Sequence, residues 1–245
     1  SVSPSLPAGL SLDTSTGAIS GTPTAVTSSA SYTITATNTG GTDTASVTIV
    51  VNDIAPSISY GTTSYTLTKG TAMTTATVTS TGGTVVSYSV SPSLPAGLSL
   101  DTSTGAISGT PTAVTSSASY TITATNTGGT DTASMTIVVN DVVPSNLAYS
   151  PNTFTLTKGT QMTSVSPTAT GGTIISYSVS PSLPAGLSLD TSNGTISGTP
   201  TAVTSSASYT ITATNTGGSD TASVTIVVND VIPSDLDYSP NSFTL

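Results

Sequence analysis

The sequence of 245 residues contains no cysteine, histidine or tryptophan, and charged residues make up only 5% of it. Its eleven acidic residues are all aspartate and its two basic residues are both lysine, which gives a net charge of −9. Without cysteine, the chain forms no disulfide and offers a metal no thiolate ligand. Without a basic patch, it cannot neutralise nucleic-acid phosphates, so we expect no nucleic-acid partner.

The same composition leaves few groups for catalysis. General acid–base chemistry recruits histidine, glutamate, lysine or an aspartate with a shifted pKa, and a nucleophilic serine or threonine needs a neighbouring base. The hydroxyl residues here have no such partner, and most aspartates fall at predicted turns. We therefore predict that the protein is not an enzyme and carries no organic cofactor. No apolar run approaches 18 residues, so no membrane span is predicted in this sequence.

Serine and threonine dominate the chain, while apolar residues still reach 35%. Disordered chains combine low hydrophobicity with high charge, so this composition favours a folded protein with apolar cores and a hydroxyl-rich surface. Threonine and valine branch at Cβ and suit a pleated sheet. Composition and organisation together indicate an extracellular or cell-surface protein, and bacterial surface proteins also often lack cysteine.

Near-identical repeats organise the sequence. The nineteen-residue string LPAGLSLDTSTGAISGTPT begins at residue 6, returns unchanged at residue 94, and returns with small changes at residue 183. The string VVND ends at Asp53, Asp141 and Asp230, which are 88 and 89 residues apart. The extra residue falls in the linker before the third copy. Repetition at a fixed period predicts a tandem array of one structural unit.

These spacings set the predicted domains. They are the back part of one repeat (1–53), two whole repeats (54–141 and 142–230) and the start of a further repeat (231–245). Because the sequence starts and stops inside repeats, we interpret it as a window of a larger protein. A processed fragment whose ends are completed by a neighbour is the alternative.

Short alternating segments predict the strands of one repeat. In the third repeat they are 154–159, 174–179, a hairpin over 183–198, 207–215 and 222–228. Ile175, Tyr177 and Val179 are expected on the inner face, and Asp190 and Gly194 in the hairpin turn. Turn signals recur every 8–12 residues and no helical period appears. This pattern predicts an all-β fold of tandem immunoglobulin-like antiparallel β-sandwiches.

Tyrosines at inward positions carry a further hint. The spacing Ala207-x-Tyr209-x-Ile211 matches an immunoglobulin F strand. The tyrosine at this position in each copy (Tyr32, Tyr120 and Tyr209) is a candidate tyrosine corner, whose hydroxyl would bond to nearby backbone. A sugar-binding face is the alternative, although a tyrosine at an inward position normally belongs to the core.

The string LPAGLSLD, then TG or NG, then ISGTP, followed by YTITATNTGG, resembles the He-PIG immunoglobulin-like repeats of large bacterial surface proteins. These repeats are relatives of cadherin-like domains, and the resemblance covers each repeat in full. It implies seven-stranded sandwiches strung in tandem on extracellular proteins. It implies no single activity.

The cadherin relationship also implies calcium at the junctions. VVNDIAP is similar to the cadherin linker, LDTSTG to the cadherin LDRETG, and Ala36–Asn38 stands where cadherins have A-x-D. This sequence departs from that pattern, because Ser15 and Asn38 replace two carboxylates, whereas calcium takes six to eight oxygens. The candidate ligands are Asp13, Asn38, Asn52 and Asp53 with their equivalents Asp101, Asn126, Asn140 and Asp141. Turn capping by these side chains is the alternative.

Lysine and asparagine offer two modification hypotheses. Lys69 and Lys158 could form cross-links with asparagine, but each stands alone beside a glycine turn, which favours a solvated lysine. Asn193-Gly-Thr195 is a single N-glycosylation sequon, present in only one repeat. The threonine-rich outer strand faces could carry O-glycans, although hydroxyl faces are also ordinary strand exteriors.

Together these patterns predict a structural extracellular repeat protein that forms a rod, stalk or filament and serves in surface attachment or adhesion. Its expected partners are neighbouring repeats, identical chains in a filament, and a surface glycan or protein. The alternative is a carbohydrate-binding module of a larger surface protein. Exposed aromatic side chains usually form such sites, and only the linker-proximal Tyr60, Tyr149 and Tyr238 could supply them.

Overall fold

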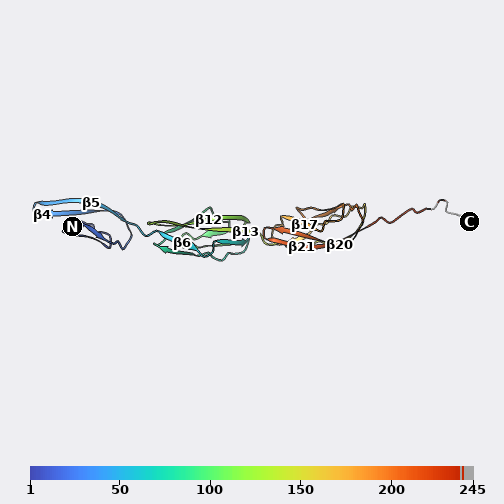
Figure 1. The fold of residues 1–245 in the computed structure, drawn as a ribbon, viewed down its shortest axis with the longest axis horizontal. Coiled ribbons are helices and arrows are strands. Elements are labelled where there is room, and N and C mark those ends of the chain that lie inside the picture. The colour runs from blue at the N-terminus through green and yellow to red at the C-terminus, as the bar shows by residue number, and fades with distance from the viewer. Residues whose placement is uncertain (238, 240–245) are drawn as a thin grey trace. The chain divides into compact units, whose positions relative to one another are not determined.

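The computed structural model describes residues 1–237 and 239, and every regular element in them is a β-strand (Figure 1). The predicted all-β class is confirmed. The described part contains no helix long and apolar enough to cross a membrane. Contacts divide the chain into two compact units, which we describe separately. The first comprises Ser1–Thr66, Ala72–Thr112 and Ser116–Val138, and the second comprises Leu67–Thr71, Ala113–Thr115 and the chain from Val139 onward.

The first 53 residues contribute five strands to the first unit. They are β1 (Val2–Ser3), β2 (Leu10–Leu12), β3 (Ile19–Gly21), β4 (Thr27–Asn38) and β5 (Gly41–Val51). β4 and β5 form a long antiparallel hairpin with β1 on the other edge of β4, while β2 and β3 form a short separate hairpin. Glycine and asparagine at the β4–β5 turn end the alternating pattern of the two strands.

Eight strands follow in residues 54–141. They are β6 (Pro56–Tyr60), β7 (Ser64–Thr68), β8 (Val78–Gly82), β9 (Ser87–Ser91), β10 (Leu98–Leu100), β11 (Ile107–Gly109), β12 (Thr115–Asn126) and β13 (Gly129–Asn140). One sheet has the order β7-β13-β12-β9. β6 pairs with β8 and β10 pairs with β11. An isolated bridge between Ala76 and Ile107 connects these two pairs.

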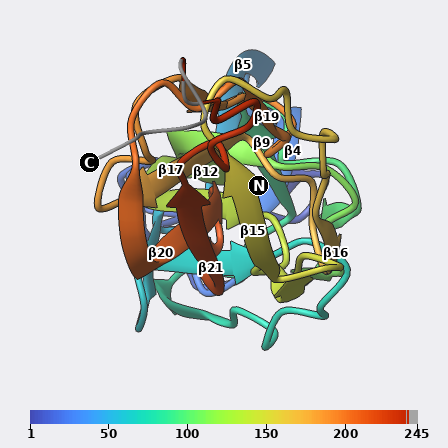
Figure 2. The same cartoon turned by 90° about the vertical axis from the view of Figure 1, so that its right-hand side faces the viewer.

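The second unit repeats this arrangement. Its strands are β14 (Ser145–Ala148), β15 (Thr153–Thr157), β16 (Thr168–Thr170), β17 (Ser176–Ser180), β18 (Leu187–Leu189), β19 (Ile196–Gly198), β20 (Thr204–Asn215) and β21 (Gly218–Asn229). One sheet has the order β15-β21-β20-β17, whose strands lie side by side in Figure 2. β14 pairs with β16, and β18 pairs with β19. β15 and β21 run parallel, which the predicted antiparallel pattern did not include.

The core of the second unit follows the alternation of its two longest strands. Tyr209, Ile211 and Ala213 on β20 are buried, and Val224, Ile226 and Val228 on β21 are fully buried with them. Side chains from β14 and β19 pack into the same cluster, which closes the sandwich. The prediction that Ile175 points inward is wrong, because this residue precedes β17 and its side chain is 63% exposed.

The long strand β4 of residues 1–53 is far less buried than its counterparts β12 and β20. Ile122 and Ala124 on β12 are fully buried. Their counterparts on β4 are less covered: Ile34 is half-buried and Ala36 is exposed. The difference arises because β4 and β5 have no neighbouring strands that correspond to β6, β7 and β8 in the described residues.

Candidate functional site

The tip of the long hairpin in each repeat holds the backbone of the linker that enters that repeat. Asn126, the last residue of β12, donates its side-chain Nδ2 to the Ile54 carbonyl oxygen at 2.7 Å. Its Oδ1 accepts the amides of Gly128 and Gly129 across the turn. One buried side chain therefore shapes the tip and binds the linker.

An aspartate on the neighbouring strand holds the linker a second time. Asp131 on β13 accepts the amide of Ile58 at 2.7 Å. Strand pairing aligns this aspartate with the alanine two residues before the asparagine, as Ala213 is aligned with Asp220 in the second unit. Asn126 and Asp131 therefore bind a carbonyl of the linker and an amide of β6, the strand that follows the linker. We call the set 124–131, with its equivalents 36–43 and 213–220, the hairpin tip.

The second unit repeats both contacts. Asn215 donates to the Val142 carbonyl oxygen at 2.7 Å, and Asp220 accepts the Leu147 amide at 2.8 Å. This linker is one residue longer, and the register shift between β14 and β16 falls between Ser145 and Ala148. Asn146 lies there with a positive φ of 56°. Asparagine tolerates this conformation better than most residues, so the extra residue is absorbed and both contacts are retained.

The linker aspartate anchors the start of the same segment. The carboxylate of Asp141 accepts the Val142 amide at 2.9 Å and the Thr173 amide at 3.0 Å. Its own amide donates to Oγ1 of Thr216 at 2.8 Å. Asp53 forms the equivalent bonds with Ile54, Thr84 and Thr127. This aspartate, with the tip asparagine and tip aspartate, forms what we call the linker clamp.

Two glycines make room for the clamp. A Cβ on Gly128 would lie 2.0 Å from the Asp53 carbonyl oxygen, and a Cβ on Gly217 would lie 2.1 Å from that of Asp141. Neither glycine has a positive φ. These positions therefore require glycine because the linker backbone approaches so closely.

One lysine adds a charge to the clamp of the second unit. Nζ of Lys69 lies 3.9 Å from Oδ1 of Asp141, and Asp141 is almost fully buried. The backbone amide of Lys69 also donates to the Asn140 carbonyl oxygen at 2.8 Å. The lysine was predicted to be a solvated turn residue, and its side chain is indeed partly exposed.

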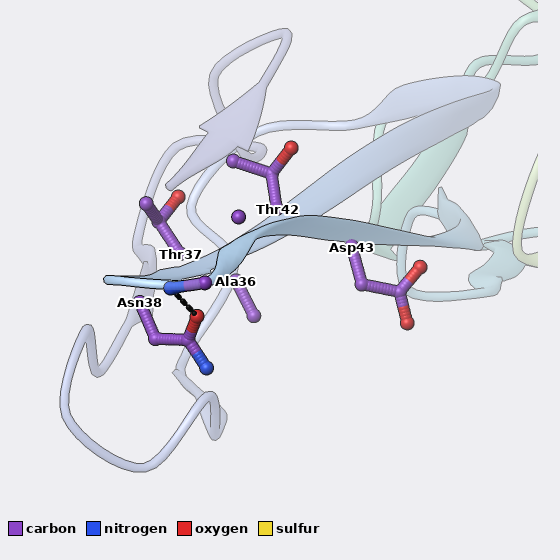
Figure 3. Close-up of a pocket in the computed structure, with 7 residues that line it drawn as sticks. Ala36, Thr37, Asn38, Thr42 and Asp43 are labelled. Atoms are coloured by element: carbon purple, nitrogen blue, oxygen red, sulfur yellow. Dashed lines mark hydrogen bonds between the residues drawn. The ribbon is translucent and has the colours of Figure 1, made fainter.

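The hairpin tip of residues 1–53 contacts no linker among the residues that the structure describes. Figure 3 shows Asn38 and Asp43 on one side of the β4–β5 hairpin, with Thr37 and Thr42 on the other. Asn38 still accepts the Gly40 amide at 2.8 Å. Residues 36–38 and 40–43 line a pocket here. Asn38 and Asp43 are exposed, whereas Asn126 is buried and Asp131 is half-buried.

The aspartates of the LDTSTG motif lie in a different place, the turns of the short hairpins. Oδ1 of Asp13 accepts the hydroxyl of Ser15 at 2.6 Å and the amides of Ser15 and Thr16. These bonds lower the pKa of Asp13 to about 2, with the Ser15 hydroxyl as the largest cause. Asp101 has the same environment and the same pKa. Asp190 is also in such a turn, and the Ser192 hydroxyl lowers its pKa.

The linker tyrosines are structural. The hydroxyl of Tyr60 donates to the Gly105 carbonyl oxygen at 2.5 Å, and that of Tyr149 donates to Gly194 at 2.5 Å. Burial raises the pKa of Tyr60 to about 12 and raises that of Tyr149 above its usual value. The predicted aromatic platform is therefore wrong for Tyr60 and Tyr149, whereas Tyr238 lies outside the described residues.

The tyrosine-corner hypothesis does not hold for the predicted residues. Tyr32, Tyr120 and Tyr209 are buried, but none of their hydroxyls bonds to backbone within the part of the chain that the structure describes. The hydroxyl–backbone bond belongs instead to Tyr60, the last residue of β6, and to Tyr149, which directly follows β14. The F-strand spacing identified the core position but not the hydrogen bond.

The family comparison matches the repeats directly. The model of the family described as Putative Ig domain (He_PIG) matches residues 1–52, 55–140 and 143–229, which together cover most of the chain. The chain belongs to this family. In each of its three He-PIG segments, the matched residues end just before the VVND aspartate. The linker aspartate therefore lies between matched segments, where the clamp begins.

Solved structures with tandem domains are similar to this He-PIG chain. The I-band fragment I67–I69 from titin matches with 16% identity and a TM-score of 0.43, covering 82% of this chain and 75% of that one. The extracellular domains 3–5 of Drosophila OTK match with 17% identity and a TM-score of 0.42, covering 91% and 78%. Human Protocadherin-24 EC1-2 matches with 16% identity and a TM-score of 0.33, covering 74% and 100%. No curated protein matches the chain.

The candidate calcium ligands at the He-PIG junctions already have hydrogen-bond partners. Both carboxylate oxygens of Asp53 already accept amides, and Oδ1 of Asn126 accepts two. Among the residues described, no three acidic, histidine or cysteine side chains come together. Calcium requires six to eight oxygens, several of them carboxylates.

Of the predicted calcium ligands, Asp53 and Asn126 lie at the same linker residue, Ile54. Asp53 accepts the Ile54 amide, and Asn126 donates to the Ile54 carbonyl oxygen. Asp13 and Asp101 occupy their own turns. Asn52 and Asn140 form no side-chain hydrogen bond with other described residues. Calcium binding by the eight candidates stays a prediction of the sequence.

The sequence interpretation missed the aspartate of the hairpin tip. Asp43, Asp131 and Asp220 belong to the repeated string NTGG-x-D. A carboxylate aligned with an inward alanine, two residues after a glycine turn, is an unusual choice at the end of a core-facing strand. Its presence in all three copies was the available signal.

Proposed function

We propose that this chain is part of a structural, non-catalytic extracellular repeat protein that forms a rod, stalk or filament and serves in surface attachment or adhesion. Tandem Ig-like repeats are typical of extracellular structural and adhesion proteins. The observation that carries the proposal is the linker clamp, which is formed by the same three side chains at both junctions. The clamp fixes the linker to the repeat that it enters, which leaves fewer linker residues free to bend between repeats.

The hydrogen bonds of the linker clamp are suited to holding repeats in series. The hairpin tip binds backbone groups only, so its grip does not depend on linker side chains. Asp141 and Asn215 are nearly inaccessible to water, being 8% and 6% exposed. Hydrogen bonds to a charged acceptor contribute about 1.5–3 kcal/mol each. Neighbouring repeats are therefore the first partners, as in other linear arrays.

Electron microscopy of the native protein tests the proposal. We expect straight or gently curved particles whose length grows with repeat number. The variant Asp131→Ala with Asp220→Ala should give particles with a wider distribution of bend angles, because the amides of Ile58 and Leu147, on the strands that follow the linkers, lose their acceptor. Isolated globules, or wild-type particles as flexible as the variant, would overturn the proposal.

The carbohydrate-binding alternative gains no support from the described residues. Two of its three candidate tyrosines are buried and bonded to backbone carbonyls. Attachment of the proposed rod to a surface glycan or protein would depend on a different surface.

A further inference from the structure

Two strands of the second unit, β15 and β21, lie side by side and run parallel (Figure 2). They pair over five residues, beginning with Thr153 opposite Thr225. The Thr225 amide extends the ladder at one end, where it donates to the Asn152 carbonyl oxygen at 2.8 Å. The Lys158 amide extends it at the other end, where it donates to the Asn229 carbonyl oxygen at 2.9 Å. The ladder therefore joins an early strand of the repeat to its last strand.

Tension along the chain loads this ladder in shear. In a tandem array the chain pulls on β15 from its amino end and on β21 from its carboxyl end. Because the two strands are parallel, these pulls are opposed along a common axis, and every bond of the ladder carries force at once. Such a ladder yields only when several bonds break together. It therefore resists tension better than the same number of bonds broken one by one.

Residues 142–152, which precede β15, are held by contacts that follow one another along the chain. The linker clamp bonds the Val142 carbonyl and the Leu147 amide to the hairpin tip. β14 pairs with β16 through two residue pairs that are separated by a register shift. The hydroxyl of Tyr149 then bonds to the Gly194 carbonyl. Tension that enters at the linker reaches these contacts in sequence, so they break one at a time and before the ladder.

Release of this segment lengthens the chain while the sandwich stays closed. Residues 142–152 extend to about 35 Å when they are straight. In the folded repeat they connect the hairpin tip to Thr225, which lies about 23 Å along β21 from its first residue, Gly218. The difference gives an extension of about 10 Å. Only Leu147 and Tyr149 of the buried core cluster belong to the released residues, so the rest of the core remains packed.

We propose that residues 142–152 form a releasable segment, which peels from the second unit under tension and returns when tension falls, while the β15–β21 ladder keeps the sandwich folded. The surface that rebinds the segment persists after release. Asn215 still accepts the amides of Gly217 and Gly218, which shape the tip without the linker. The inference rests on the proposed structural role, because a repeat under no tension would not use such a segment.

Lys158 provides a variant that weakens the ladder alone. The Thr160 amide donates to the Thr157 carbonyl oxygen at 3.1 Å and Gly159 has a φ of 79°, which defines a turn with the exposed Lys158 as its second residue. Proline is favoured at this position. Lys158→Pro therefore removes the bond to Asn229 without opposing the local fold. Lys158→Met is the matched control, because it removes the same charge and keeps the amide.

Asp220 provides a variant that weakens the segment alone. Its carboxylate accepts the Leu147 amide at 2.8 Å. It lies on β21 outside the residues that pair with β15, which begin at Thr225. Asp220→Ala should therefore ease the release of residues 142–152 and leave the ladder unchanged.

Single-molecule stretching of the full chain, tethered at its two ends, tests the proposal. In the wild type, a reversible step of about 10 Å should precede the long unfolding step of the second unit, which the Lys158 variants identify. Asp220→Ala should lower the force of the short step only. Forced unfolding is governed by the unfolding rate, so Lys158→Pro should accelerate the long step about five-fold relative to Lys158→Met, the effect of one hydrogen bond.

Each half of the proposal has its own contrary result. A long step with no short step before it, or a short step that Asp220→Ala leaves unchanged, would rule out the release of residues 142–152. Equal unfolding rates of Lys158→Pro and Lys158→Met under force would rule out shear of the ladder. Neither result bears on the proposed rod, stalk or filament, because electron microscopy tests that role on the protein without tension.

Discussion

One glycine-to-alanine substitution, made at three equivalent positions, distinguishes the effect of the linker contact on stability from the effect of the hairpin's own fold. Gly40, Gly128 and Gly217 occupy one position of near-identical hairpin tips. A Cβ would lie 2.0 Å from the Asp53 carbonyl oxygen at the second tip and 2.1 Å from that of Asp141 at the third. It would meet no linker at the first tip. The Gly128 and Gly217 variants therefore test the linker contact, and Gly40→Ala is the control at a tip without that contact.

The expected magnitude follows from overpacking. Contacts near 2 Å force the linker backbone to move, and overpacking of this kind destabilises by about 1–3 kcal/mol. Gly128→Ala and Gly217→Ala should therefore loosen their linkers by about that amount. Gly40→Ala should change stability by less than about 1 kcal/mol, because alanine restricts the unfolded chain while its Cβ, 3.2 Å from Oδ1 of Asn38, requires only a small shift of that side chain.

Amide hydrogen exchange measures this effect locally. The informative amides are those of Ile58 and Leu147, which the tip aspartates accept. Their exchange should accelerate about 5- to 150-fold in Gly128→Ala and Gly217→Ala respectively, since about 1.4 kcal/mol corresponds to a factor of ten. Unchanged exchange in either variant would refute the steric reasoning. So would an equal effect of Gly40→Ala on these amides.

Three further outcomes are expected. Tyr149→Phe should destabilise the third repeat by about 1–3 kcal/mol in thermal unfolding, because the Gly194 carbonyl loses a buried donor, whereas Tyr65→Phe should change stability little. The pKa values of Asp13 and Asp101, about 2 against an ordinary 3.8, mean that their turns are fully stabilised above about pH 4 and lose this contribution as the pH falls through about 2. Carbon-detected NMR titration of the carboxyls checks this, and a midpoint near 3.8 would contradict it. The melting temperature should not change on addition of a calcium chelator, because the junction oxygens are occupied by amides, and a fall of several degrees would instead support the predicted calcium site.

The sequence was sufficient to predict the strands because their periodicity is strong. Tyr209, Ile211 and Ala213 alternate with threonine, and their inward positions are confirmed. The parallel pairing of β15 with β21 could not be deduced, because alternation gives the face of a strand and not its neighbour. The prediction for Ile175 failed for a related reason, since the alternating pattern begins before the first residue of β17.

The clamp was harder to predict because its targets are backbone atoms. Asn126 was singled out from the cadherin comparison, which placed it correctly near the linker but assigned it to a metal. The structure gives its amide to the Ile54 carbonyl instead. The side chains of a linker do not indicate that one of its backbone carbonyls will accept a hydrogen bond from the hairpin tip. Only the hairpin half of the contact, NTGG-x-D, leaves a trace in the sequence.

Recognition of backbone also explains which parts of the repeats vary. The segments after the junction aspartates differ (IAPSI, VVPSNL and VIPSDL), while the hairpin tips are almost invariant. A tip that binds one carbonyl and one amide accepts any linker that can place those two groups at the right separation. Asn146 shows how an inserted residue meets this condition, since a single positive φ restores the register. Repeats built in this way can be duplicated or joined in a new order without matched changes at their junctions, because each tip fits every linker of the array.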